Sequence, residues 1–226
     1  MIKTRFFQLL FFIPILGFSQ YTAIPDTNFE KSLIELGIDD LVDGKVLSNK
    51  IKHVKSLDLA WKEISDLTGI QGFDSLQNLD CSANPFITLD LSKNTALLHL
   101  DLDAEGDYTC KITSLDLRNN TELTYLDCGT SDIKKLNLSK NIALKELYCS
   151  WCKIKTIDLS NNIELVRLEV SYNKLKRLDL SNNTKLLSLD VGNNRLKDLV
   201  LDNNTSLKSI YCAGNKFDCK SILSKY

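Results

Sequence analysis

Seven cysteines offer the widest chemical repertoire in this 226-residue chain. Four of them share one position of a repeated pattern: Cys81, Cys128, Cys149 and Cys212. Other copies of the pattern have Leu102, Val170 or Val191 there, so we expect this position to face a hydrophobic core, where cysteine behaves as a small apolar residue. A zinc site needs a tetrahedral ligand set, and the one pair Cys149-x-x-Cys152 does not predict a metal centre. We therefore expect buried thiols.

Disulfides are the alternative for some of these cysteines. Cys128 and Cys149 would lie on adjacent strands, where parallel side chains hold the Cβ atoms farther apart than the ~3.8 Å that a disulfide prefers. Cys219 follows Cys212 by seven residues. A bond between them would pin the end of the chain, although we expect that Cys212 would then leave its packed row. The odd total leaves one thiol unpaired.

The two histidines, His53 and His99, fall in different copies of the pattern. His99 lies near Asp101, but no serine or cysteine is placed as a nucleophile for such a pair. No glycine-rich phosphate loop or zinc-protease motif occurs. The sequence therefore predicts a protein that is not an enzyme, has no cofactor and carries a surface histidine at position 99.

Acidic residues recur at one outward position of the pattern: Asp58, Asp80, Asp101, Asp127, Glu169 and Asp190. Like charges on adjacent strands repel by roughly 1 kcal/mol in water, which favours a basic partner. A second acidic row (Asp90, Asp116, Asp158, Asp179) instead indicates a general feature of the repeat. Nearby cations favour a solvated, sign-segregated surface: Lys134, Lys135, Lys153, Lys155, Lys174, Lys176, Arg177, Arg195 and Lys197.

A calcium site is conceivable at Asp39, Asp40 and Asp43, because these carboxylates precede Gly44 and calcium prefers oxygen ligands at such turns. Their spacing does not match the EF-hand loop, which also ends in a glutamate. We expect a solvated turn.

Exposed aromatic residues are the least regular feature of the pattern. Four of them fall in three consecutive copies, at positions expected to point outward: Tyr125, Tyr148, Trp151 and Tyr172. Exposed tryptophan and tyrosine are enriched in binding hot spots. The alternative is that these rings pack along the sheet and shield its backbone. We predict a contact patch made of these four rings with Asp127 and Glu169.

The element that positions these residues is a 21-residue repeat. Copies start at Val54, Leu76, Leu97, Leu123, Leu144, Leu165, Leu186 and Leu207, with intervals of 22, 21, 26, 21, 21, 21 and 21 residues. Leucines at L-x-x-L-x-L-x-x-N spacing define a leucine-rich-repeat solenoid. We expect a β-rich α/β repeat solenoid, a right-handed coil with parallel strands, of seven complete turns and a partial last turn, over residues 54–226.

Each copy holds two nested L-x-x-L-x-L-x-x-N units, and both show the alternation of a short strand. If both form strands, the solenoid is flattened; if only the cysteine-containing half does, it is an arc. Two sets of asparagines recur in phase: Asn94, Asn120, Asn141, Asn162, Asn183 and Asn204 in one, and Asn84, Asn173, Asn194 and Asn215 in the other. We interpret both as structural, because an inward asparagine can bond backbone groups freed by a corner.

The segments LTYLDCGTSDIKKLNLSKNIA and LVRLEVSYNKLKRLDLSNNTK resemble bacterial leucine-rich-repeat proteins of the nested 21-residue, IRREKO type. The first turn, ISDLTGIQGFDSL, is similar to an internalin repeat. The resemblance covers residues 54–226 and implies protein–protein interaction or adhesion, with no shared active site.

The start of the chain predicts export. Residues 1–19 combine Lys3 and Arg5 with the apolar run LLFFIPILGF, which is typical of a secretory signal and too short for a membrane span. No cysteine follows directly, so we expect no lipid anchor. The last repeat, from Leu207 to Tyr226, has only 20 residues, so we expect no wall anchor and a protein that is secreted or at the bacterial cell surface.

Residues 20–53 are expected to form an N-terminal cap on the solenoid. Phe29, Leu33 and Leu36 have helical spacing, Thr27 and Glu30 fit a capping box, and Gly37 can end the helix.

The sequence as a whole predicts a secreted, non-enzymatic binding module that uses the strand face of the solenoid. A protein partner is favoured; a glycan is the first alternative, and self-assembly into an oligomer is the second. The charge balance, 28 basic against 29 acidic residues, does not favour nucleic acid.

Overall fold

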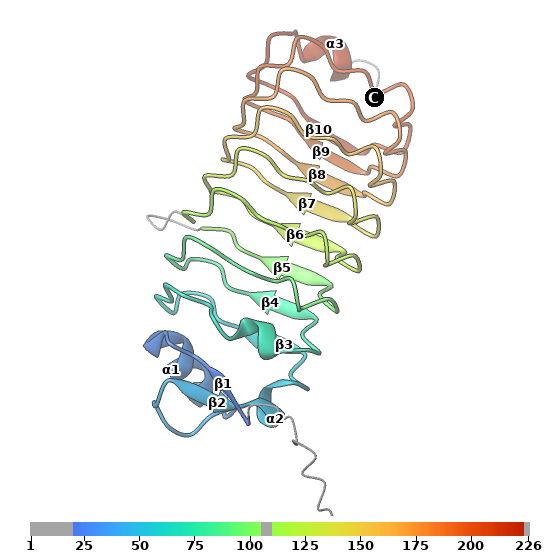
Figure 1. Cartoon of the computed structure of the whole chain (residues 1–226). Coiled ribbons are helices and arrows are strands. Elements are labelled where there is room, and N and C mark those ends of the chain that lie inside the picture. Colours follow the sequence, from blue (N-terminus) through green and yellow to red (C-terminus); the bar gives the residue numbers. More distant parts are fainter. Residues whose placement is uncertain (1–19, 105–109, 224–226) are drawn as a thin grey trace, which may run out of the picture.

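The structure, a computed structural model, describes residues 20–104 and 110–223. The expected signal peptide (1–19) and residues 105–109, which belong to the five-residue insertion that lengthens one repeat interval from 21 to 26, lie outside the described residues. Figure 1 shows an elongated stack of turns, with the N-terminal elements at one end and α3 (Lys220–Leu223) at the other. No helix in the described part is long and apolar enough to cross a membrane.

One strand from each turn joins a parallel eight-stranded sheet along the stack (Figure 1). The strands are β3 (Ser56–Asp58), β4 (Asn78–Asp80), β5 (His99–Asp101), β6 (Tyr125–Asp127), β7 (Glu146–Tyr148), β8 (Arg167–Glu169), β9 (Ser188–Asp190) and β10 (Ser209–Tyr211). Their order follows the chain without crossovers. Leucine or isoleucine occupies the middle of every strand, in register with its neighbours. The predicted solenoid of parallel strands is confirmed.

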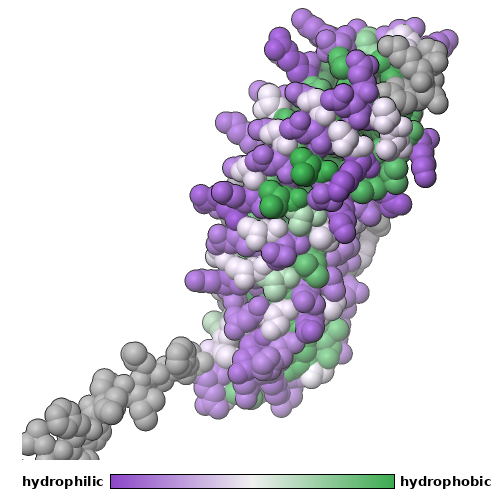
Figure 2. All heavy atoms as spheres, turned by 90° about the vertical axis from the view of Figure 1, so that its right-hand side faces the viewer, coloured by the Kyte–Doolittle hydropathy of each residue, from purple (hydrophilic) through white to green (hydrophobic). Residues whose placement is uncertain are grey.

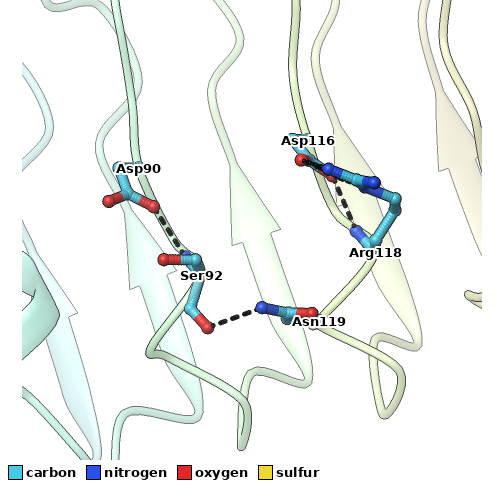
Figure 3. Close-up of polar contacts among 5 residues, drawn as sticks. All are labelled: Asp90, Ser92, Asp116, Arg118 and Asn119. Atoms are coloured by element: carbon cyan, nitrogen blue, oxygen red, sulfur yellow. Dashed lines mark hydrogen bonds and ion pairs between the residues drawn. The ribbon is translucent and has the colours of Figure 1, made fainter.

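In the part of the chain that the structure describes, only the cysteine-containing half of each turn forms a strand. The other half winds through side-chain-capped turns, which compete with strand pairing. Figure 3 shows two of them: Asp90 accepts a hydrogen bond from the Ser92 amide, and Asp116 accepts one from Arg118. Asn119 Nδ2 links the two turns by donating to the Ser92 carbonyl at 3.0 Å. The sequence left open whether both halves of a turn form strands or only one half does; the structure has strands in one half.

The core runs through the stack, and the cysteine row belongs to it. Cys81, Cys128, Cys149 and Cys212 are each at most 1% exposed. Of the two states that the sequence left open for Cys212, a buried thiol or a disulfide with Cys219, the structure has the disulfide, and the expectation that Cys212 would leave its row to form it was wrong. Cys212 forms the bond within its row, since the last segment folds back over the end of the core and brings Cys219 to it. The five other cysteines, including Cys110 and Cys152, are buried and free.

The corner that follows the second half of each turn is built on the first asparagine set, here called the far-corner ladder (Asn94, Asn120, Asn141, Asn162, Asn183, Asn204). All six are fully buried. Asn162 Nδ2 donates to the carbonyls of Leu138 (3.1 Å) and Asn141 (2.8 Å) in the previous turn. The Oδ1 atom of each has no hydrogen-bond partner within the described chain. These asparagines therefore act through their donors alone.

The corner that follows each strand is built on a second row, here called the strand-end ladder (Asn84, Cys110, Ser131, Cys152, Asn173, Asn194, Asn215). Asn173 donates to the Cys149 carbonyl at 2.7 Å and accepts from the Ile154 amide at 3.0 Å, so both ends of its side chain are used. Three middle turns lack asparagine. There Cys152 Sγ lies 3.3 Å from the Cys128 carbonyl and 3.2 Å from Ser131 Oγ. The structural interpretation of both asparagine sets is confirmed.

The N-terminal segment packs on the first turn. It contains β1 (Tyr21–Ala23), α1 (Thr27–Glu35), the antiparallel partner β2 (Lys45–Leu47) and α2 (Ser48–Ile51), and a 3-10 turn, η1 (Ile70–Gly72), follows β3. Phe29 and Leu33 are fully buried, whereas Leu36 is exposed. Gly37, with φ of 70°, ends the helix region as expected.

The predicted capping box of α1 was wrong. Asp26 caps the helix by accepting from the amides of Asn28 and Phe29, and it also accepts from the Ser65 amide in the first turn. Glu30 is therefore not needed at the cap, and its Oε1 accepts from three successive backbone amides, at positions 43–45. This buried carboxylate fixes the turn at Gly44, where the sequence left calcium as an alternative.

Candidate binding face

Two outward columns of side chains cover the parallel sheet, one from the first residue of each strand and one from the third. In the middle turns, the first column runs His99, Tyr125, Glu146 and Arg167. The third-residue column runs Asp101, Asp127, Tyr148 and Glu169. The chemistry of this face therefore changes from acidic to aromatic and mixed at β6 and β7. Figure 2 shows the side of the molecule on the right of Figure 1, where hydrophobic side chains interrupt a largely hydrophilic surface.

The aromatic part of this face is a connected group. Tyr125 stacks on His99 with ring centres 4.0 Å apart and meets Tyr148 at 5.5 Å. The Tyr148 hydroxyl donates to Glu146 Oε2 at 2.8 Å, and Arg167 Nη1 lies 3.3 Å from the same oxygen. We call these five residues the strand-face group. Because each ring or head group is held by a neighbour, the group is pre-organised for contact with a ligand.

Two predicted carboxylates flank Tyr148 in its column. Burial raises the pKa of Asp127 to about 7; the Gly129 amide opposes this by hydrogen bonding, and the charges of Asp103 and Asp101 add to it. Burial, with the nearby charge of Asp190, also raises the pKa of Glu169. A carboxylate whose pKa is raised in this way favours a partner that supplies a cation or a hydrogen-bond donor.

Trp151 and Tyr172 lie on the corner after β7 and β8, not on the strands themselves. Their rings stack at 3.8 Å with an interplanar angle of 9°, and their exposed fractions are 59% and 42%. We call them the corner pair. Both have positive φ, 57° and 52°, a region that disfavours bulky residues. The same corner position has positive φ in most other turns, at Trp61, Ala83, Thr130, Asn193 and Gly214, so the backbone is a feature of the repeat and the adjacent large rings are particular to these two turns.

The predicted contact patch thus divides into two parts. Tyr125, Asp127, Tyr148 and Glu169 lie on the strands, while Trp151 and Tyr172 project from the corner.

Three members of the strand-face group were not predicted from the sequence: His99, Glu146 and Arg167. The five-residue insertion before β6 breaks the regular repeat spacing between His99 and Tyr125, so the sequence did not show that the two residues are neighbours. Within residues 20–104 and 110–223, no three His, Cys, Asp or Glu side chains are arranged to hold a metal ion.

Comparisons with known proteins place the fold. No protein-family model matches the chain, and a search of curated protein sequences finds no match. Internalin C2 from Listeria monocytogenes has a similar structure, with a TM-score of 0.81 and 21% identity over 92% of this chain and 94% of that chain. A leucine-rich-repeat protein from Leptospira interrogans follows at 0.65 and 23%, over 78% of this chain and 47% of that one.

A third similar structure is TLR13 in its complex with ssRNA13, with a TM-score of 0.52 and 28% identity over 65% of this chain and 23% of that chain. These likenesses agree with the repeat and the parallel sheet. The expected resemblance is confirmed at the level of fold: the chain is an internalin-like leucine-rich-repeat solenoid.

Proposed function

We propose that the chain is a secreted, non-enzymatic binding module that recognises a protein partner through the strand face of its middle turns and the corner that adjoins this face. The contact residues are Tyr125, Asp127, Tyr148, Trp151, Glu169 and Tyr172. His99, Glu146 and Arg167 support them from the same face. Export follows from the signal expected in residues 1–19, and the protein then acts outside the bacterial cell or at its surface.

The observation that carries this proposal is the corner pair. Placing a non-glycine residue in the left-handed region costs about 1–2 kcal/mol, and two large rings with φ of 57° and 52° are also left substantially exposed. Trp61 shares the positive φ and the exposure, but only Trp151 and Tyr172 place large rings at this corner on adjacent turns, where the two rings stack and still leave their outer faces open to solvent. Residues retained in a strained backbone cluster at functional sites, and tryptophan and tyrosine are the residues most enriched in binding hot spots.

The rest of the face suits a protein ligand. Arg167 and Glu146 form an ion pair beside the Tyr148 ring, so charged and aromatic groups alternate over a few ångströms. Such a mixed surface, with aromatic anchors inside a polar rim, is typical of protein–protein interfaces. A preformed sheet also loses little entropy on binding.

The test is affinity capture from culture and host-surface extracts with the secreted chain and two variants. One carries Tyr148→Ala, Trp151→Ala and Tyr172→Ala. The matched control removes three other exposed rings, with Tyr21→Ala, Trp61→Ala and Tyr211→Ala. We expect a partner that is retained by the wild type and the control and lost by the patch variant.

Other outcomes of this test count against the proposal. Retention by the patch variant moves the site elsewhere. Capture of a glycan instead of a protein supports the carbohydrate-adhesin alternative, because an exposed indole ring also suits a sugar ligand. Failure to capture any ligand, together with a mass in solution that rises with concentration, supports self-assembly.

A further inference from the structure

A second surface with the properties of a binding site lies on the segments that follow the strand-end corner. A cavity of about 540 Å³ is lined there by Lys155, Thr156, Lys174, Lys176, Arg177 and Arg195. Five of these six residues are cations, and they come from three successive turns. We call this cavity the basic groove.

The cations of the groove follow the period of the repeat. Lys174 and Arg195 are separated by 21 residues, as are Lys155 and Lys176, so each pair occupies one position in adjacent turns. The same two positions continue to Lys216 and Lys197 in the turns beyond. Adjacent turns are ~4.8 Å apart. The positive charges therefore form two columns along the axis of the solenoid.

No cation of the basic groove forms an ion pair with any residue of the described chain. The cation that precedes Lys174 in its column differs, because Lys153 pairs with Asp132 at 2.5 Å. The chain as a whole carries a formal net charge of −1, so the groove is a local concentration of one sign. Cations placed this closely repel one another, and a negatively charged ligand would relieve that repulsion.

The backbone under the groove is fixed from turn to turn. The Lys174 amide donates to the Ile154 carbonyl at 2.8 Å, and the Arg195 amide donates to the Leu175 carbonyl at 2.8 Å. Asn173, fully hydrogen-bonded in the strand-end ladder, holds the Ile154 amide at 3.0 Å. The spacing of the backbone positions that carry the charges is therefore set before any ligand arrives, which lowers the entropy lost on binding.

We propose that the basic groove binds a linear sulfated polysaccharide lying along the solenoid axis. Repeating anionic groups along such a chain match repeating cations along the columns, and lysine-rich patches suit sulfated ligands. The lining contains no aromatic ring, whereas single-stranded nucleic acid relies on stacking of its bases. The groove shares no residue with the proposed contact patch, so this inference is independent of the proposed function.

The experiment measures the affinity of the chain from Gln20 for heparin, used as the sulfated polysaccharide, by a surface biosensor at low and moderate salt. The groove variant carries K174Q, K176Q and R195Q. The control carries K31Q, K52Q and K208Q, which removes the same charge at exposed positions elsewhere. We expect the groove variant to weaken binding at least about tenfold and the control to stay within about twofold. Circular dichroism confirms that both variants are folded.

Three ligands of other chemistry complete the test: desulfated heparin, poly-glutamate and single-stranded DNA. The proposal requires that heparin binds more tightly than each of them. Equal weakening by the groove and control variants would overturn it, because binding would then follow net charge alone. Undiminished binding of desulfated heparin, tighter binding of DNA or of poly-glutamate, or no heparin binding by the wild type would also overturn it.

Discussion

The two ladders at the corners of the solenoid solve the same problem in different ways. In the far-corner ladder, asparagine occurs without interruption from Asn94 to Asn204, yet every Oδ1 lacks a partner in the described chain. In the strand-end ladder, an asparagine such as Asn173 uses both its donor and its acceptor, yet Cys110, Ser131 and Cys152 replace it in three turns. The ladder with the better hydrogen bonding is thus the one that the chain interrupts.

The interruption lies beside the features that we associate with binding. The replaced turns carry the five-residue insertion, β6 and β7 with Tyr125 and Tyr148, and Trp151 immediately before Cys152. The far corner of the same turns is regular. The regular positions of the repeat therefore build the scaffold. The positions where a turn departs from the repeat pattern gather at the strand-end corner, next to the exposed rings.

The largest expected effect separates the two ladders directly. Asn173→Ala leaves the buried Cys149 carbonyl and Ile154 amide without this partner, so we expect a loss of about 3–4 kcal/mol of unfolding free energy. Asn162→Ala removes two donated bonds but also one unpaired oxygen, so we expect about 2 kcal/mol. Urea unfolding measures both. The exposed Asn161→Ala is the control, and an equal loss at 162 and 173 would contradict the distinction.

A smaller effect on stability is expected from Asp127, on the strand face next to the interrupted strand-end ladder. The pKa of Asp127 is raised to about 7 in the folded protein. The folded state therefore keeps this proton after the unfolded state has released it, and the contribution of Asp127 to stability falls as pH rises from about 4 to 7. We expect Asp127→Asn to gain roughly 1–2 kcal/mol over the wild type between pH 4 and pH 8. Denaturant unfolding across pH measures this gain, and a constant difference between the two proteins would refute the assignment.

Restoring the ladder should produce a modest gain. In Cys152→Asn the new side chain can donate to the Cys128 carbonyl and accept from the Ile133 amide, as Asn173 does one turn later. We expect stabilisation of about 0.5–1 kcal/mol, seen as a higher thermal midpoint. Cys152→Ala provides the comparison, because it removes the thiol without adding the amide. If Cys152→Asn lowers the midpoint below that of Cys152→Ala, asparagine does not fit this turn.

The smallest effect on stability is expected at the corner pair. Trp151→Gly relieves the unfavourable φ but removes the stack on Tyr172, and these two terms are each about 1 kcal/mol. The unfolding free energy should therefore change by less than about 1 kcal/mol while partner capture is lost. Unfolding and capture are measured on the same preparation. A loss of several kcal/mol would instead assign Trp151 a role in the fold.

Much of this architecture was readable from the sequence because it is periodic. A 21-residue spacing predicted the parallel sheet, the buried cysteine row and the structural role of both asparagine sets. The same patterning could not tell which half forms strands, because both halves alternate equally. Local capping decided that question, through aspartates such as Asp90 and Asp116 that bond the backbone two residues on.

Contacts that cross the period were missed or left undecided by the sequence. Asp26 takes the cap of α1 because it also bonds the first turn, 39 residues away. Cys219 reaches Cys212 because the chain folds back at its end. In the candidate site, the sequence identified the aromatic rings but not their division into a strand-face group and a corner pair. That division depends on the positive φ that follows β7 and β8, and Trp151 and Tyr172 are residue types that give no sign of it.

The most direct test of the central claim places a photo-reactive amino acid at position 148, on the strand face, or at position 160, on the exposed second half of the same turn. Each protein is irradiated with the partner identified by capture. A cross-link from position 148 and none from position 160 is the predicted result. A cross-link from position 160 alone would show that the partner binds the opposite side, and the strand face of the middle turns would not be the recognition surface.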